Sequence, residues 1–152
     1  MTVAQASRTL LRVREDVHIH TPAAAVYRQL DDPTTYHEWL SHHFHDFTFT
    51  DADVIAFSLA LPLHTDTARL RRDRDETQVL AFVADGRGTV EGLNWAFHAE
   101  SPREVHLTAE LAYRPAGGPF GALLEAILHR PYRTQALRES LWNLKQRVER
   151  GA

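Results

Sequence analysis

Four histidines lie within nine residues in the segment YHEWLSHHFHDF: His37, His42, His43 and His45. Neutral imidazole is a common ligand of zinc and copper and a general base near neutral pH. His43 and His45 are two residues apart, so they would point to the same side of an extended strand. The chain nevertheless has no H-E-x-x-H motif and no cysteine, and Asp46 would face the other side of such a strand. We therefore predict no metal site and infer no cofactor.

Two polar residues fall in the apolar phase of expected strands. His45 shares the parity of Phe47 and Phe49, which would turn its imidazole into the interior. Glu15 alternates with the apolar residues of the segment 9–20. A buried carboxylate must be paired, hydrogen-bonded or protonated, and it can then act as a general acid or base. The alternative for Glu15 is a bulge or strand end, where its side chain meets solvent.

Other side chains with polar tips carry weaker signals. Tyr36 and Trp39 flank the histidine-rich segment, and no motif assigns a catalytic role to Asn94 or Tyr132. Trp95 and Tyr113 share the phase of apolar neighbours, so we expect both in the core, with Arg114 a possible partner for Glu15. His98 and His106 fall in the polar phase of their strands and are expected to face solvent.

The elements that must position these residues can be read from periodicity. Residues 9–20 alternate with period two and predict a strand. The segment HTPAAAVYRQLDD predicts a helix, with Thr21 as N-cap and Pro22 in the first turn. Pro33 then opens a second short helix that runs to about Leu40.

Six further strands are predicted, separated by turn residues without intervening helices, so they should pair as an antiparallel meander. Their ranges are 44–50, 54–62, 66–74, 77–84, 89–99 and 103–114.

The remainder of the chain, after PAGG at 115–118, returns to helical periodicity. The expected apolar stripe consists of Phe120, Leu124, Ile127, Ala136 or Leu137, Leu141, Leu144 and Val148. Pro131 lies inside this segment and should kink or break the helix near His129. The prediction is thus an α+β fold in which a seven-stranded antiparallel sheet is covered by a long C-terminal helix.

This order resembles the helix-grip fold of the START/Bet v 1-like (SRPBCC) superfamily, especially its polyketide cyclase/dehydrase-like branch. The opening VHIHTPAAAVYRQLDDPTTYHEWL is similar to the family's strand, Pro-headed helix and aromatic turn at Pro22, Val26, Tyr27, Asp32, Tyr36 and Trp39. The segment LNWAFHAESPREVHLTAELAYRPAGGPF is similar to its Trp-containing strand, Tyr-ended strand and Gly-Pro turn. Pro131 departs from the family's uninterrupted last helix.

The resemblance implies a hydrophobic cavity between the sheet and the long helix. The alternative is that large side chains simply fill the interior, since apolar lining is expected in both cases. The candidate ligand-binding residues are Glu15, Tyr36, Trp39, His45, Phe47, Phe49, Phe57, Leu59, Trp95, Phe97, Tyr113, Leu124 and Leu128.

Composition narrows the function classes. The 152 residues suit one domain spanning 1–152, and a net charge of −3 gives no footprint for nucleic acid. We find no signal peptide and no apolar run long enough to span a membrane, so the expected location is cytoplasmic. Sequence leaves homodimerisation open.

Three functions stay open at this stage. The first is binding of a small hydrophobic or amphipathic molecule of lipid, polyketide or aromatic type. The second is a cyclase/dehydratase-like enzyme, which should have a buried titratable pair in its pocket. The third is a protein-interaction module with a closed core, which should expose an apolar patch.

Overall fold

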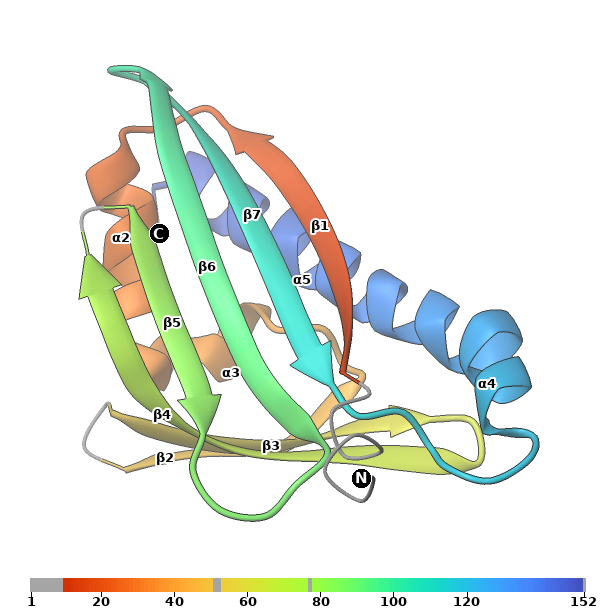
Figure 1. Cartoon of the computed structure of the whole chain (residues 1–152). Helices are drawn as coiled ribbons and strands as arrows, with labels where there is room; N and C mark the ends of the chain where they lie inside the picture. Colours follow the sequence, from red (N-terminus) through yellow and green to blue (C-terminus); the bar gives the residue numbers. More distant parts are fainter. Residues whose placement is uncertain (1–9, 51–52, 77, 152) are drawn as a thin grey trace.

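The protein, described by a computed structural model over residues 10–50, 53–76 and 78–151, contains a seven-stranded antiparallel sheet of order β1-β7-β6-β5-β4-β3-β2 (Figure 1). The strands are β1 Leu11–Ile19, β2 Phe44–Thr50, β3 Val54–Leu61, β4 His64–Glu76, β5 Val79–Ala84, β6 Val90–Ser101 and β7 Glu104–Tyr113. The helices are α2 Ala23–Asp31, the 3₁₀ turn η1 Pro33–Thr35, α3 Tyr36–Trp39, α4 Gly121–Leu124, the π turn η2 Glu125–His129 and α5 Arg130–Glu149.

This architecture confirms the predicted α+β helix-grip fold and its order of elements. Thr9, which was expected to begin the first strand, lies outside the described residues. The same is true of Asp51 and Ala52 in the turn before β3 and of Thr77, which was expected to begin the fifth strand.

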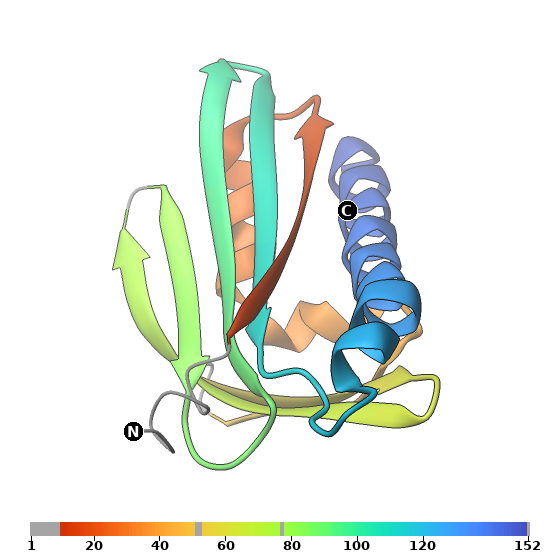
Figure 2. The ribbon, with the colours of Figure 1, turned by 45° about the vertical axis from the view of Figure 1, so that its right-hand side comes forward.

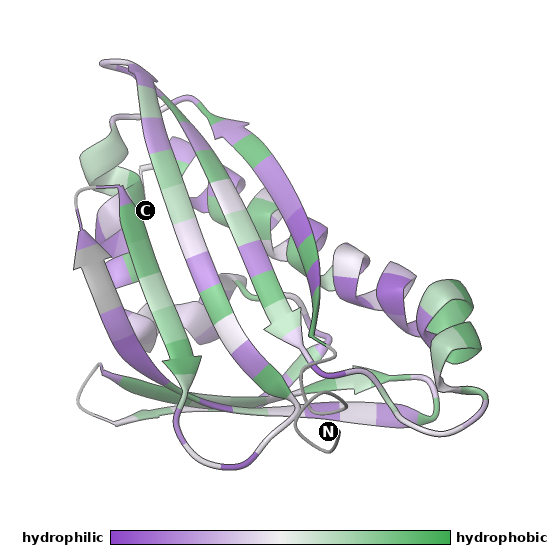
Figure 3. Cartoon of the chain, viewed as in Figure 1, coloured by the Kyte–Doolittle hydropathy of each residue, from purple (hydrophilic) through white to green (hydrophobic). Residues whose placement is uncertain are grey.

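The sheet curls around the C-terminal helix, which runs along its concave face, with α2 and α3 on the same side (Figure 2). Along the strands, hydrophobic and hydrophilic residues alternate, as bands on β1 and β6 in Figure 3 show. Leu137, Leu141 and Leu144 of α5 are at most 1% exposed. Burial of each such side chain contributes about 1.5–3 kcal/mol, which holds the helix on the sheet.

A bulge in β2 puts His45 out of phase with Phe47 and Phe49. The pairing of β2 with β3 shifts register between His45 and Thr48, and Asp46 has a φ of 54°. An extra residue in one strand reverses the alternation of side chains beyond it. His45 pairs with Ser58 on the outer face and is exposed, so the prediction that it looks into the interior is wrong. Phe49 pairs with the buried Ile55 and lies on the inner face as predicted, although it is 45% exposed at the edge of the sheet.

The C-terminal helix is continuous in direction but irregular near Pro131. Instead of a break at His129, the helix widens into the π turn η2 immediately before α5, which has the proline in its first turn. The predicted apolar stripe fails here, because Phe120 and Ile127 are 69% and 66% exposed. Glu125 and His129 occupy the buried face in their place.

A glycine in the β5–β6 connection tests how closely that connection approaches β4. Gly88 has a φ of 156°, and a Cβ there would lie 2.6 Å from the carbonyl oxygen of Thr67. We expect Gly88→Ala to lower the free energy of unfolding by about 1–3 kcal/mol in a urea titration. Gly117→Ala is the matched control, because its Cβ would meet nothing within 4 Å. Equal stability of the two variants would contradict the close approach.

Candidate functional site

A fully buried arginine lies at the centre of the interface between the C-terminal helix and the sheet. Arg133 of α5 donates from Nε to Asp66 Oδ2 at 2.7 Å and from Nη2 to Asp66 Oδ1 at 3.2 Å. Its Nη1 donates to Glu125 Oε1 at 2.5 Å, and its guanidinium carbon lies 3.6 Å from the centroid of the Tyr113 ring. Four side chains from β4, β7, η2 and α5 therefore converge on one point, and we call them the arginine cluster.

The remaining oxygen atoms of the arginine cluster are also engaged. Asp66 accepts a hydrogen bond from Thr89 Oγ1 at 3.0 Å, and His64 Nε2 lies 3.1 Å from the same carboxylate. The hydroxyl of Tyr113 donates to Glu125. Charges in an interior of low dielectric are tolerated when they are paired in this way.

His129, next to the arginine cluster, has a nitrogen without a partner. The side chain is fully buried, and its Nε2 lies 2.8 Å from the carbonyl oxygen of Pro62. A carbonyl can only accept, so Nε2 is the donor, and in the neutral imidazole this leaves the lone pair on Nδ1. Among the described residues no hydrogen-bond partner reaches this buried Nδ1. The site therefore presents an unsatisfied acceptor in the interior.

The electrostatics fix the protonation of two groups. Burial, reinforced by the hydrogen bond to Glu125, raises the pKa of Tyr113 well above its ordinary value. Burial alone would lower the pKa of Arg133, but hydrogen bonding and charge pairing with Asp66 and then Glu125 raise it. Tyr113 is thus a proton donor and Arg133 a permanent cation. Together with the lone pair of His129, the site holds a donor and an acceptor for a proton.

Of the residues predicted from sequence, Tyr113 lies in the arginine cluster, and three others lie elsewhere in the fold. Glu15 pairs with Arg138 at 3.1 Å, with its side chain 20% exposed, where β1 meets α5. Tyr36 is buried, and its hydroxyl donates to the carbonyl of Leu30 at 2.6 Å. Trp39 is also buried.

The apolar candidates are mostly placed as expected. Phe57, Leu59, Trp95 and Phe97 are buried, and the rings of Tyr36, Trp39 and Trp95 pack edge to face or tilted within 6.1 Å of one another. Phe47 is half-buried against Tyr36. Leu124 and Leu128 are half-buried. Whether these residues contact a ligand stays a prediction.

The histidine-rich segment is drawn toward α5 rather than into the interior. His42 Nδ1 and His43 Nε2 lie 3.8 and 3.6 Å from Glu139 Oε1, while His45 is exposed and takes no part. Burial, followed by the neighbouring His42, lowers the pKa of His43. The imidazole of His43 is therefore held in its neutral form.

Solved structures, rather than sequences, resemble this chain: no protein-family model and no curated protein sequence matches it. A Thermus thermophilus protein superposes with a TM-score of 0.77 at 17% identity, over 93% of this chain and 99% of that one. The two chains share the helix-grip fold. The Zhui aromatase/cyclase of a Streptomyces species follows with a TM-score of 0.67 at 18% identity, over 91% and 96% of the two chains.

A START superfamily protein from Mycobacterium smegmatis also matches, with a TM-score of 0.67 at 12% identity over 93% of this chain and 99% of that one. At these identities the START-like resemblance establishes the fold and leaves the chemistry open. Within the described part of the chain, no helix combines the length and apolar character needed to cross a bilayer.

Removal of the buried cation tests the arginine cluster. Arg133→Met would leave the carboxylates of Asp66 and Glu125 uncompensated in the interior, so we expect a loss of about 3–5 kcal/mol in the free energy of unfolding. The matched control is Arg138→Met, which removes a 61% exposed cation and should cost about 0–1 kcal/mol. Urea titrations followed by far-UV circular dichroism measure both. A similar loss in the two variants would show that Arg133 is not a compensated buried charge.

Proposed function

We propose that the chain binds a small amphipathic molecule of aromatic or polyketide type between the sheet and the C-terminal helix. The molecule's apolar body would lie against the inner face of the sheet, and a hydroxyl group would donate to His129. The observation that carries this proposal is the fully buried Nδ1 of His129, for which the described residues supply no donor.

An unsatisfied buried acceptor costs about 1–3 kcal/mol, so a donor that reaches it gains affinity from relief of that cost. The orientation of the imidazole is fixed by the carbonyl of Pro62, and the neighbouring ring of His64 stacks on it at 5.3 Å between centroids. The acceptor is thus preorganised, which lowers the entropic cost of binding.

Apolar side chains for contact with the body of the ligand lie on β3, the strand that leads to Pro62. Leu61 immediately precedes Pro62 and is 8% exposed, and Phe57 on the same strand is 4% exposed and packs edge to face on Phe44. Burial of apolar area contributes about 25 cal/mol per Å², before the cost of association. A ligand with one apolar face and one hydroxyl matches this combination.

A route of entry is favoured at the same end of the molecule. Pro62 lies in the β3–β4 turn, and Glu125 and His129 lie in η2. Large apolar side chains are exposed in this turn, at or in α4 and in η2: Leu63, Phe120, Leu123 and Ile127. Figure 1 shows the β3–β4 turn beside α4. Exposed apolar groups at the rim of an interior site are typical of ligand entrances. The π turn between them interrupts the regular helix there.

The class of ligand is suggested by two structural neighbours. One is named an aromatase/cyclase and another a di-domain ARO/CYC from a biosynthetic pathway. Phenolic and polyketide molecules carry the combination of flat apolar surface and hydroxyl groups that His129 and its surroundings would accept.

A second candidate function is a cyclase/dehydratase-like enzyme in the same site. The arginine cluster favours it, because burial holds Tyr113 protonated and the Nδ1 of the nearby His129 has no hydrogen-bond partner among the described residues. A positioned donor and acceptor are the elements of general acid–base catalysis. Turnover that is lost in Tyr113→Phe while ligand affinity is retained would distinguish the enzyme from a carrier.

The binding proposal is tested with two probes of similar size, 2-naphthol and 2-methylnaphthalene, by tryptophan fluorescence and calorimetry. The hydroxyl should give 2-naphthol an advantage of about tenfold, the value of one hydrogen bond. His129→Phe should abolish that preference, while His37→Phe, which changes an exposed histidine on α3, should keep it.

Native mass spectrometry of the untagged protein complements this titration, since a co-purified organic molecule would name the ligand class directly. Binding of neither probe, with no bound molecule in the native protein, would refute the ligand proposal. That result would favour an interaction module that uses the exposed apolar side chains. Equal affinity for both probes would refute the role of His129.

A further inference from the structure

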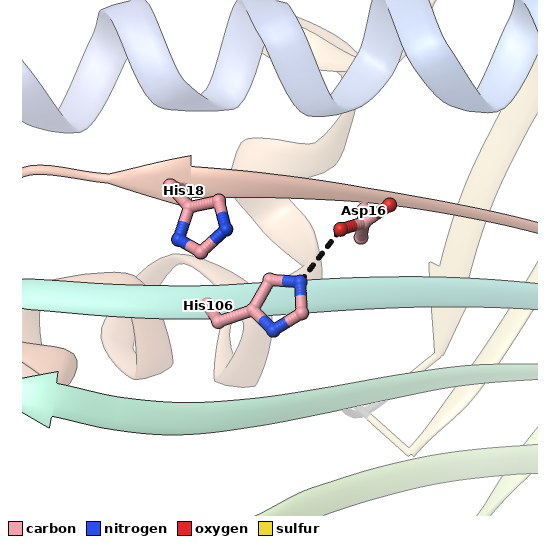
Figure 4. A group of neighbouring side chains, drawn as sticks. All are labelled: Asp16, His18 and His106. Atoms are coloured by element: carbon pink, nitrogen blue, oxygen red, sulfur yellow. Dashed lines mark hydrogen bonds and ion pairs between the residues drawn. The ribbon is translucent and has the colours of Figure 1, made fainter.

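A second cluster of chemically active side chains lies on the outer face of the sheet, away from α5. Asp16 and His18 are two residues apart on β1, so they point to the same side. His106 on β7 is the direct cross-strand partner of His18. Figure 4 shows the three side chains gathered between the two strands. This is the outer-face triad.

The geometry of the outer-face triad suits a metal ion. His106 Nε2 lies 2.6 Å from Asp16 Oδ2, and the rings of His18 and His106 stack at 4.5 Å between centroids with 5° between their planes. One potential ligand atom from each residue lies within 4.8 Å of the others. Zinc with bonds of about 2.0–2.2 Å needs its ligands about 3.3 Å apart. Because the two rings are stacked, one imidazole must rotate out of the stack for both nitrogen lone pairs to meet at one ion.

Two further carboxylates hold one of the imidazoles in place. His18 Nδ1 lies 2.8 Å from Glu100 Oε1 and 3.5 Å from Glu104 Oε2. A carboxylate that accepts the Nδ1–H of a histidine fixes its tautomer and leaves the lone pair on Nε2 for a metal. The same carboxylates supply negative charge around the site. Metal-binding histidines usually have a carboxylate or carbonyl hydrogen-bonded to their second ring nitrogen in this way.

We propose that Asp16, His18 and His106 form a binding site for a divalent transition metal ion of the zinc type. Two imidazoles and one carboxylate are a common ligand set for such ions, and solvent molecules would complete the coordination. The rigid strands β1 and β7 position the ligands, because Ile19 and Val105, which flank the site on the inner face, are fully buried. The proposal departs from our expectation from sequence that the chain holds no metal.

Another group near α5, His42 with His43 and Glu139, is less suited to an ion. His42 has an 80% exposed side chain on a turn. Glu139 already accepts hydrogen bonds from Ser41 Oγ at 2.9 Å and Gln135 Nε2 at 2.7 Å. This group serves as the internal control for the outer-face triad.

The test uses untagged, chelator-treated full-length protein titrated with Zn²⁺ by calorimetry and with Co²⁺ by visible absorption. We expect one ion per chain, with Co²⁺ bands of a low-coordinate nitrogen and oxygen site. Glu100→Gln should weaken Zn²⁺ binding about 10- to 100-fold, as removal of an outer-shell partner does. His106→Gln should weaken it further, while His43→Gln should leave it unchanged.

The side chains of the triad lie on the outer face, so the variants should fold, which circular dichroism checks. Unchanged affinity in both His18→Gln and His106→Gln would overturn the proposal. So would loss of binding in His43→Gln, because the ion would then sit at the group near α5. Failure of this site would not affect the ligand proposal, which rests on the inner face of the sheet.

Discussion

The pairing of Arg133 with Asp66 and Glu125 is the interaction on which the interior depends. The guanidinium connects α5 to β4 and η2, and its contact with Tyr113 extends the connection to β7. These strands belong to the two halves of the curled sheet between which the helix runs (Figure 2). The N–H groups of the guanidinium fix the positions of the two carboxylates, and its stacking fixes the ring of Tyr113. Because Glu125 and His129 both belong to η2, the position of His129 is fixed as well.

Stability alone gives little reason for such an arrangement. Transfer of ions to the interior carries a desolvation cost, and well-packed apolar residues in place of buried ion pairs are often neutral or stabilising. In this chain the charged groups lie next to His129, whose buried Nδ1 has no hydrogen-bond partner among the described residues. We infer that the arginine cluster serves to position polar groups at the proposed ligand site. The outer face carries a separate set of polar groups, so the two sites share the strand β7 but no side chain.

Much of the fold could be predicted because its strands, helices and turns are determined by short stretches of sequence. Alternation of apolar residues and the turn residues between them place every strand, and the resemblance of the opening and closing motifs matches the fold found. The exceptions are features that periodicity does not encode. The positive φ of Asp46 reverses the alternation in β2, and the π turn before Pro131 replaces the expected kink.

The site was harder to predict, although a signal exists. Asp66 is in phase with the buried Ala68 and Leu70, and Glu125, His129 and Arg133 recur every four residues in line with Leu137 and Leu141. These four polar residues lie in apolar rows, and all four are buried. The partners, however, are separated by 67 residues for Asp66 and Arg133 and by 90 for Asp16 and His106. Register across the sheet, which periodicity does not supply, decides which of them meet.

The separation of Asp66 and Arg133 along the chain also has a kinetic consequence. Closure of a loop of 67 residues is an entropic cost that is met only after most of the sheet has formed. We expect the arginine cluster to lose its water late, after the transition state for folding, so that it contributes little to the folding rate. The stabilisation that the cluster provides then lowers the rate of unfolding. The interior would thus stay closed mainly because the protein unfolds slowly.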